Sequence, residues 1–239
     1  MDDRTLLEKL AFTVIKGKVK DGTALTQEGI DQGINPHLVI NEGLVPGMDV
    51  VGELFRTNQY FIPEVLLSAR TMNGSMALLR PLIVGHVTET VGVAVIGTVK
   101  GDIHDIGKNL VVIMLEGAGF EVFDLGVNTP PEKFVEAVIA HEPDVLGFSA
   151  FLTTTMPMFK VNIEALKKAG LRDKVHIAVG GAPVTEEYAK HVGADSYAPD
   201  ASMATRLAKQ LVGARNEASQ GAQALEKAVK LIDETLKKG

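Results

Sequence analysis

A polar loop near the middle of the chain, residues 97–109 with the sequence GTVKGDIHDIGKN, decides the fold. The apolar run before it, residues 91–96, predicts a buried strand, and residues 108–116 after it predict a helix. In an open α/β sheet, ligands bind at the carboxyl ends of the strands, which is where this loop would lie. A neutral imidazole is a good metal ligand, and a nearby carboxylate can fix its tautomer and raise its basicity. We therefore expect the loop to present His104 to a metal, with Asp102 orienting the imidazole.

Three other interpretations of this loop remain open. Gly107-Lys108 resembles part of a phosphate-binding loop, but that motif has four residues between its glycines and Ser or Thr after the lysine. Here five residues separate Gly101 from Gly107, and Asn109 follows the lysine. A hydrolytic metal site would need further His or Asp ligands elsewhere. A single histidine can also be an ordinary loop residue.

The composition indicates a globular protein of one or two domains. The chain has 239 residues, of which 46% are hydrophobic and 23% charged, and its net charge is −6. A negative charge without a basic block disfavours nucleic acid as a partner, and the lack of cysteine excludes disulfides and thiolate ligands. No stretch approaches the ~20 apolar residues of a membrane span, and the N-terminus lacks a signal-peptide pattern. We expect a soluble, cytoplasmic protein with neither a membrane nor nucleic acid as partner.

Residues 1–85 show the apolar spacing that predicts helices. Four helices with short connections are expected to form an antiparallel bundle. The first helix is expected to end at Gly17, a short second one to start near Thr26, a third to start at Asn35-Pro36 with an interruption at Pro46-Gly47, and a fourth to run from Pro63 to Pro81.

From residue 91 onwards, short apolar strands alternate with helices, which predicts a parallel sheet covered on both faces. Five strands fit the flavodoxin-like, doubly wound Rossmann-type order. The expected strands are 91–98, 121–125, 144–150, 175–180 and 195–198, and the expected helices are 108–118, 131–141, 155–169 and 185–192.

We divide the chain into a helical domain over residues 1–85, an α/β domain over 91–212 and a helical tail over 213–239, with residues 82–90 as the linker. The apolar stripe of the tail favours packing on the protein itself over docking to a partner.

Two further loops at the same sheet edge have unusual compositions. Residues 149–155, after the third strand, contain four hydroxyl side chains in seven residues, and Gly180-Gly181 follows the fourth strand. Paired glycines permit a ligand to approach the backbone closely, although Ser and Thr in such a loop could simply begin a helix. Together with the His104 loop, they predict a deep slot for a long polar ligand.

These three motifs resemble those of the cobalamin-binding domains of methionine synthase and of the corrinoid proteins of methyltransferase systems. The shared pattern is Asp-x-His-x-x-Gly, then Ser-x-Leu, then Gly-Gly. It matches Asp102, His104, Gly107, Ser149, Gly180 and Gly181. Phe151 stands where the family usually has Leu, which implies altered packing against the nucleotide tail of the cofactor. Residues 48–55 and 61–65 resemble the family's helical cap, so the resemblance covers nearly the whole chain apart from about the last 25 residues.

The resemblance also implies roles for individual residues. The corrinoid's own base leaves the cobalt, and His104 replaces it as lower axial ligand, with Asp102 accepting its other ring proton and Thr155 bonding to Asp102. Ser149 and Thr153 contact the buried base, while Gly180 and Gly181 let the tail pass. The other implied cofactor-binding residues are Gly101, Ile103, Asp105, Gly107 and Phe151 around the loops, and Phe55, Ile62 and Val65 as an apolar cover on the upper face.

The function implied by the resemblance is that of a methyl-carrying corrinoid protein. A cobalamin or related corrinoid, methylated in one of its states, would take its methyl group from a substrate-specific methyltransferase of the methylamine, methanol, methoxyarene or betaine type. An acceptor methyltransferase would receive the group, and a reductive-activation protein is a further candidate partner. Such a subunit is not expected to catalyse on its own. The alternative is a cobalamin-binding sensor, although the chain shows no basic DNA-binding module. A cobalamin-dependent mutase would need a large catalytic barrel, for which there is no room.

Overall fold

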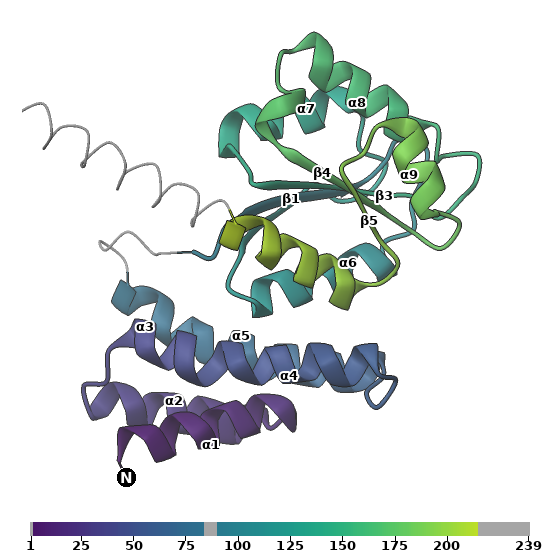
Figure 1. The fold of residues 1–239 in the computed structure, drawn as a ribbon. Coiled ribbons are helices and arrows are strands. Elements are labelled where there is room, and N and C mark those ends of the chain that lie inside the picture. Colours follow the sequence, from purple (N-terminus) through teal and green to yellow (C-terminus); the bar gives the residue numbers. More distant parts are fainter. Residues whose placement is uncertain (1, 84–89, 215–239) are drawn as a thin grey trace, which may run out of the picture.

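The computed structural model describes residues 2–83 and 90–214, and it shows a group of helices beside a sheet with helices on both faces (Figure 1). The N-terminal helices are α1 (Asp3–Ile15), α2 (Val19–Asp31), α3 (Pro36–Leu38), the π-helical turn η1 (Val39–Leu44), α4 (Val45–Arg56) and α5 (Ile62–Ile83). Their shared core contains Leu6, Leu10, Leu44, Met72 and Leu79. No helix within the described ranges is long and apolar enough to cross a membrane.

Local signals set both ends of α1 and the start of α3, and the end of α1 before Gly17 and the start of α3 at Asn35-Pro36 confirm the prediction. At the start of α1, the side chain of Asp2 accepts a 2.9 Å hydrogen bond from the N–H of Thr5, and Gly17 follows the helix with a φ of +63°. At the start of α3, the side chain of Asn35 accepts a 2.9 Å hydrogen bond from the N–H of His37. Each of these polar side chains satisfies a backbone donor that the first helical turn leaves unpaired.

The predicted start of the second helix at Thr26 is wrong, because α2 begins at Val19. A Cβ added to Gly22 would lie 2.6 Å from Cγ2 of Thr71 in α5. A small residue is therefore needed where α2 crosses α5, and this packing outweighs the low helix propensity of glycine.

The predicted interruption of the third helix at Pro46 and Gly47 is wrong. Instead, the π-helical turn η1 leads directly into α4, and the missing N–H of Pro46 falls in the first turn, where no intrahelical partner is needed. A Cβ on Gly47 would lie 2.8 Å from the carbonyl oxygen of Ala11, so the glycine permits close packing of α4 on α1.

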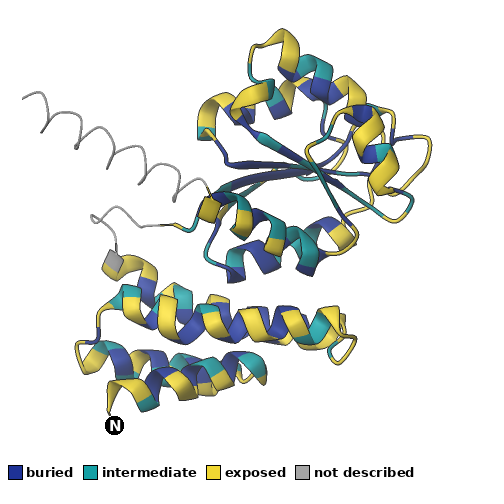
Figure 2. Cartoon of the chain, viewed as in Figure 1, coloured by how far each residue is buried: buried dark blue, intermediate teal, exposed yellow. Residues whose placement is uncertain are grey.

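The second half of the chain forms a five-stranded parallel sheet in the order β2-β1-β3-β4-β5, which confirms the predicted flavodoxin-like order. The helices α7, α8 and α9 pack on one face, and α6 with a helix over residues 201–214 covers the other (Figure 1). Buried residues accordingly concentrate between the sheet and both helical layers (Figure 2). The strands are β1 (Val93–Thr98), β2 (Glu121–Asp124), β3 (Val145–Ser149), β4 (His176–Gly180) and β5 (Ser196–Ala198). The helices between them are α6 (Ile106–Gly117), α7 (Pro131–His141), α8 (Met158–Lys168), the 3-10 turn η2 (Arg172–Lys174) and α9 (Glu186–Val192).

The helix over residues 201–214 was not predicted. The carboxylate of Asp200 accepts a 2.8 Å hydrogen bond from the N–H of Met203, and Ala208 and Val212 pack into the core beneath the sheet. These residues show an N-cap followed by an apolar stripe, signals that the sequence contains. The predicted apolar stripe of the tail lies in residues 215–239, and most of the predicted linker in residues 84–89, both outside the described residues.

The helical domain contacts α6 of the α/β domain through α4 and α5, and α4 runs antiparallel to α6. A Cβ on Gly52 would lie 3.2 Å from Cε of Met114, and one on Gly117 would lie 2.7 Å from Cε of Met48. This pairing directs the end of α4 and the α4–α5 turn toward the start of α6. Polar contacts join α4 to the helix over 201–214: Lys209 Nζ to Asp49 Oδ1 at 2.5 Å, Arg206 to Glu53 at 3.6 Å, and Ser202 Oγ to the carbonyl oxygen of Gly52 at 3.0 Å.

Candidate functional site

The carboxyl ends of four strands lie side by side at one edge of the sheet. Thr98 pairs with Ser149, Ser149 with Gly180, and Gly180 with Ala198. The loops that follow these strands therefore start from a common line. This register brings the three loops that were predicted to form a slot to the same place.

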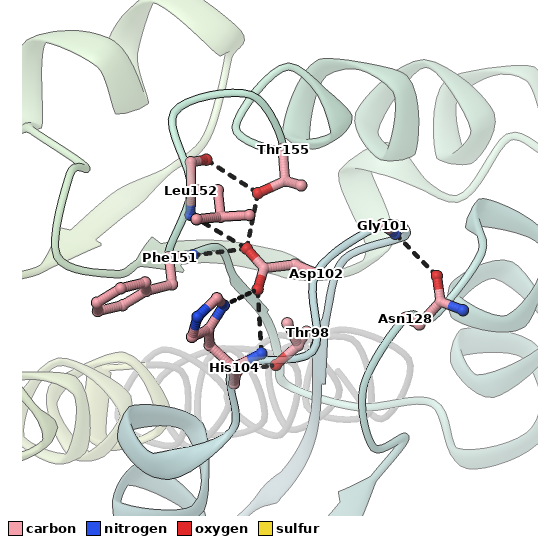
Figure 3. Close-up of polar contacts among 8 residues, drawn as sticks. All are labelled: Thr98, Gly101, Asp102, His104, Asn128, Phe151, Leu152 and Thr155. Atoms are coloured by element: carbon pink, nitrogen blue, oxygen red, sulfur yellow. Dashed lines mark hydrogen bonds and ion pairs between the residues drawn. The ribbon is translucent and has the colours of Figure 1, made fainter.

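Backbone contacts fix the loop between β1 and α6 (Figure 3). Gly101 has a φ of +85°, and its N–H donates a 2.8 Å hydrogen bond to Oδ1 of Asn128. The N–H of Asn128 in turn donates to the carbonyl oxygen of Asp102 at 2.8 Å, and Oγ1 of Thr98 donates to that of His104 at 3.1 Å. The loop thus holds a defined shape through contacts with its own strand and with the loop after β2.

The carboxylate of Asp102 is fully buried and connects two loops (Figure 3). Its Oδ1 accepts a 3.1 Å hydrogen bond from the N–H of His104 and lies 2.7 Å from Nδ1 of the same residue. Its Oδ2 accepts hydrogen bonds from the N–H groups of Phe151 and Leu152, at 2.8 and 3.2 Å, and from Oγ1 of Thr155 at 2.7 Å. Both oxygens are therefore occupied by donors.

These contacts determine the charge of Asp102 and the tautomer of His104. Burial alone would raise the pKa of the Asp102 carboxyl, but the hydrogen bonds from Thr155, His104 and Phe151 hold that pKa well below its ordinary value. An ionised carboxylate can only accept a hydrogen bond, so the ring proton of the neutral imidazole is on Nδ1. Nε2 therefore keeps its lone pair. The side chain of His104 is 45% exposed, and Nε2 has no hydrogen-bond partner among the described residues. It is available as a metal ligand.

Phe151 stacks on the imidazole of His104. The two ring centroids are 4.4 Å apart and the ring planes are inclined by 27°. The sequence singled out Phe151 as a departure from a leucine, but it gave no sign that the ring would lie against the histidine.

The space around two glycines indicates whether a large ligand fits at this edge of the sheet. A Cβ on Gly107, in the first turn of α6, would meet no protein atom within 4 Å, so open space adjoins the His104 loop. A Cβ on Gly181, which has a φ of +137°, would lie 1.9 Å from the carbonyl oxygen of Ala150. Only glycine lets the β4 loop approach the β3 loop this closely. An open space beside a free imidazole nitrogen fits a metal carried by a large organic group.

The other predicted site residues lie around this edge with different exposures. Ser149 and Gly180 are half-buried, Thr153 is exposed, and Ile103 is 73% exposed. Asp105 is exposed and accepts a 3.1 Å hydrogen bond from the side chain of Asn109.

Of the three residues expected as an apolar cover, two have exposed surface. Ile62 is 42% exposed and Phe55 is half-buried, whereas Val65 is fully buried in the core of the helical domain. In this arrangement Val65 offers no surface to a ligand, because it faces the other helices.

Leu152, Asn128 and Thr98 contribute to the site but were missed. Leu152 acts through its backbone N–H, which gives its side chain no distinctive signal. Asn128 has a φ of +52°, a conformation that asparagine tolerates better than most residues, so its identity was an available signal.

The alternatives for the loop are less well supported by the geometry. The side chain of Lys108 is buried, and its Nζ donates to Asp124 Oδ2 at 2.5 Å and to Asn109 Oδ1 at 2.6 Å, so it is not presented to a phosphate. Within residues 2–83 and 90–214, no three His, Cys, Asp or Glu side chains cluster in a way that could hold a metal ion, which the hydrolytic site would require.

A cavity of about 380 Å³ lies at the opposite, amino-terminal edge of the sheet and is lined by Asp144, Arg172, His176 and Asp195 among others. Arg172 and Asp195 form an ion pair there at 2.6 Å. This cavity is remote from the His104 loop.

The chain is similar to known cobalamin-binding proteins. Residues 92–206 match the family model of a B12 binding domain, and residues 6–80 match a second model with the same description. The chain is 42% identical over 213 residues to the dimethylamine corrinoid protein 1 of Methanosarcina acetivorans, covering 89% of this chain and 100% of the relative. It is 43% identical over 181 residues to trimethylamine corrinoid protein 1 of the same organism, covering 74% of this chain and 83% of the relative. Among solved structures, a chain of the methanol:cobalamin methyltransferase complex from Methanosarcina barkeri is similar, with a TM-score of 0.80 and 30% identity over 89% of this chain and 81% of that chain.

Proposed function

Because the chain belongs to the family of B12-binding corrinoid proteins, we propose that it carries a methyl group on a bound cobalamin or related corrinoid for methyltransferases. The observation that carries this proposal is the pair formed by Asp102 and His104. A buried, ionised carboxylate holds the imidazole proton at Nδ1, and Nε2 is left free beside open space at the carboxyl edge of the sheet.

When bound, the corrinoid supplies a cobalt centre that can accept and release a methyl group. His104 would offer Nε2 as the protein ligand to the cobalt, Asp102 fixes the tautomer, and Thr155 and two backbone N–H groups hold Asp102 in place. An imidazole hydrogen-bonded to a carboxylate is a stronger electron donor, so this arrangement strengthens ligation by His104.

The loops around His104 accommodate the rest of the cofactor. Ser149 and Thr153 contact the buried nucleotide base, and Gly180 and Gly181 leave room for the tail. A Cβ on Gly181 would lie 1.9 Å from the carbonyl oxygen of Ala150, so the β4 loop packs directly on the β3 loop and glycine is required there. The remaining residues that surround the cofactor are Gly101, Ile103, Asp105, Gly107 and Phe151.

The helical domain covers the upper face of the cofactor. Phe55 and Ile62, at either side of the α4–α5 turn, provide the apolar surface, and Val65 supports them from the helical core. The antiparallel contact between α4 and α6 supports this assignment, since it directs the α4–α5 turn toward the loop that carries His104.

The protein works with methyltransferases. A substrate-specific methyltransferase loads the methyl group, a second one removes it, and a reductive-activation protein restores the cobalt after oxidation. The names of the relatives mention dimethylamine and trimethylamine, and the solved complex is a methanol enzyme, which supports a methylated amine or methanol as the methyl donor. These relatives favour methyl transfer over the alternative of a cobalamin-binding sensor.

The proposal is tested by loading the purified protein with hydroxocobalamin, reducing its cobalt(III) with an added chemical reductant, to cobalt(II) for spectroscopy and to cobalt(I) for the assay, and measuring methyl transfer with methyltransferases that use methylamines or methanol. The wild-type protein is expected to bind one corrinoid whose cobalt(II) resonance spectrum shows splitting by one histidine nitrogen. His104→Ala should lose this splitting and the transfer activity, while His191→Ala, at an exposed histidine in α9, should keep both. A nitrogen splitting that survives in His104→Ala would contradict the assignment of the ligand.

A further inference from the structure

Phe151 contacts both members of the pair that presents the imidazole. Its backbone N–H donates a 2.8 Å hydrogen bond to Oδ2 of Asp102, and its ring stacks on His104 with the centroids 4.4 Å apart (Figure 3). The backbone contact fixes the position of the Phe151 backbone, from which the phenyl ring extends, because Oδ2 is itself held by Leu152 and Thr155. The position of the phenyl ring relative to the imidazole is thus set by the same carboxylate that orients the imidazole.

The hydrogen bond from Nδ1 to Asp102 does not by itself fix the plane of the imidazole. The χ2 torsion of histidine has a broad distribution of values. A single hydrogen bond therefore lets the ring tilt about the line that joins the donor and acceptor atoms. Nearly half of the side chain of His104 is exposed, so few other groups limit this motion. A flat ring against one face of the imidazole does limit it, because a tilt would break the stacked contact.

The phenyl ring of Phe151 contributes little to the hydrophobic cores of the fold. The side chain of Phe151 is about half exposed, at 51%, and it belongs to none of the hydrophobic core clusters of the described residues. A leucine at this position would keep the backbone hydrogen bond to Asp102 but would offer no flat surface to the imidazole. The stack is therefore the contact that the aromatic side chain adds.

We propose that Phe151 is a positioning residue for His104, whose ring holds the imidazole in the plane that directs Nε2 at the cobalt and so favours the histidine-ligated form. This inference rests on the proposed function. Stacking of the strength usual for aromatic pairs corresponds to about a two- to tenfold change in the ratio of histidine-ligated to unligated corrinoid.

The test has two readouts on four proteins: the wild type, Phe151→Leu, Phe151→Tyr and the control Phe12→Leu. The control makes the same substitution at a phenylalanine of α1 that is equally exposed, at 51%, and lies outside the site. The first readout is proton NMR of the cofactor-free protein labelled at histidine, in which a stacked phenyl ring shifts the His104 ring protons upfield. The second is the fraction of cobalt(II) that shows histidine nitrogen splitting after loading with hydroxocobalamin and one-electron reduction of its cobalt(III) by an added chemical reductant.

Phe151→Leu is expected to lose the upfield shift and to lower the ratio of ligated to unligated cobalt two- to tenfold. Phe151→Tyr, which keeps the flat ring, and Phe12→Leu should resemble the wild type in both readouts. Equal ligated ratios in all four loaded proteins would overturn the role of Phe151 and leave the proposed function intact. A wild-type protein that binds no hydroxocobalamin would overturn the proposed function, while the upfield shift would still report the stack.

Discussion

The hydroxyl of Thr155 and the carboxylate of Asp102, 53 residues apart in the sequence, form a buried hydrogen bond of 2.7 Å. This bond reaches Oδ2, the oxygen that also accepts from two backbone N–H groups, and it leaves Oδ1 for His104. The two oxygens of Asp102 thus have separate tasks, one anchoring the β3 loop and the other setting the imidazole.

Asp102→Asn should reverse the tautomer of His104. The amide oxygen must face the three donors on the Oδ2 side, which places the amide NH₂ against Nδ1 of His104. Nδ1 then has to accept, so the ring proton moves to Nε2 and the metal-binding lone pair is lost. Nitrogen-15 NMR of the cofactor-free protein is expected to show the Nε2–H tautomer, and the affinity of the imidazole for cobalt should fall about 10- to 100-fold.

The matched control is Asp105→Asn, at the exposed aspartate on the other side of His104. Its side chain contacts Asn109 rather than the imidazole, so the tautomer should remain that of the wild type. An unchanged tautomer in a folded Asp102→Asn protein would refute the proposed role of this carboxylate.

Gly107→Ala and Gly181→Ala should separate ligand binding from folding. A Cβ on Gly107 meets no protein atom within 4 Å, so its replacement should change the free energy of unfolding of the cofactor-free protein by no more than about 1 kcal/mol. The same Cβ would intrude on the corrinoid, and we expect about tenfold weaker binding. Equilibrium unfolding and cobalamin titration measure the two effects, and unaltered cobalamin binding by Gly107→Ala would place the cofactor elsewhere.

Gly181→Ala is expected to destabilise the cofactor-free protein by about 2 kcal/mol or more. The new Cβ would lie 1.9 Å from the carbonyl oxygen of Ala150, and the φ of +137° is strained for any residue with a side chain. Wild-type stability in this variant would mean that the β3 and β4 loops can separate freely.

Asp195→Asn should reduce stability most at neutral pH. Burial acts to raise the pKa of Asp195, but hydrogen bonds from Arg172 and the N–H of Ile177 lower it below its ordinary value. A lowered native pKa gives stability that is fully present above the unfolded pKa of about 3.9 and is lost as the pH falls through the native value. We expect the free energy of unfolding to fall by about 1 to 2 kcal/mol near pH 7, and this difference from the wild type to shrink toward pH 3. Each kcal/mol corresponds to a decrease in Tm of roughly 2–4 °C.

Thermal unfolding between pH 3 and pH 7 provides this measurement. Asp173→Asn is the control, because Asp173 is exposed in the neighbouring turn η2 and should leave the profile unchanged. A constant difference between Asp195→Asn and the wild type across this range would contradict the lowered pKa.

Joining the two domains covalently should block methyl exchange. A Cβ on Gly52 would lie 3.9 Å from Oγ of Ser202, so the pair Gly52→Cys and Ser202→Cys is placed to form a disulfide in a chain that has no other cysteine. If the helical domain must move away from the cofactor, the oxidised protein should retain cobalamin but exchange methyl groups at least about tenfold more slowly until reduced. Each single cysteine variant serves as a control, and full-rate exchange by the oxidised protein would exclude a moving cover.

The strands could be predicted closely because their residues carry a strong local signal. Short runs such as β1 are buried on both faces, and their apolar composition and their alternation with helices suffice to predict a parallel sheet. The meeting of the loops that carry His104, Ser149 and Gly180 follows from parallel strands ending at one edge. The Asp102–Thr155 contact was anticipated only through the family resemblance.

What could not be predicted depends on backbone groups and on packing between distant elements. Leu152 binds Asp102 through an N–H that every residue except proline has, so its identity carries no information about the contact. The early start of α2 depends on how Gly22 packs against Thr71, nearly fifty residues further on. The stack of Phe151 on His104 depends on side-chain torsions, which the order of residues does not specify.

The separation of Asp102 from its partners has a consequence for how the protein is made. During synthesis, Asp102 leaves the ribosome 53 residues before Thr155, and β4 with Gly181 follows later still. Until then the carboxylate lacks the three donors on its Oδ2 side, and the β4 loop is absent. Domains fold as units once their residues have emerged, so a nascent chain that stops after α6 has the histidine but no place for the cofactor. The order of synthesis therefore places a cofactor-free stage before the proposed cofactor site is complete.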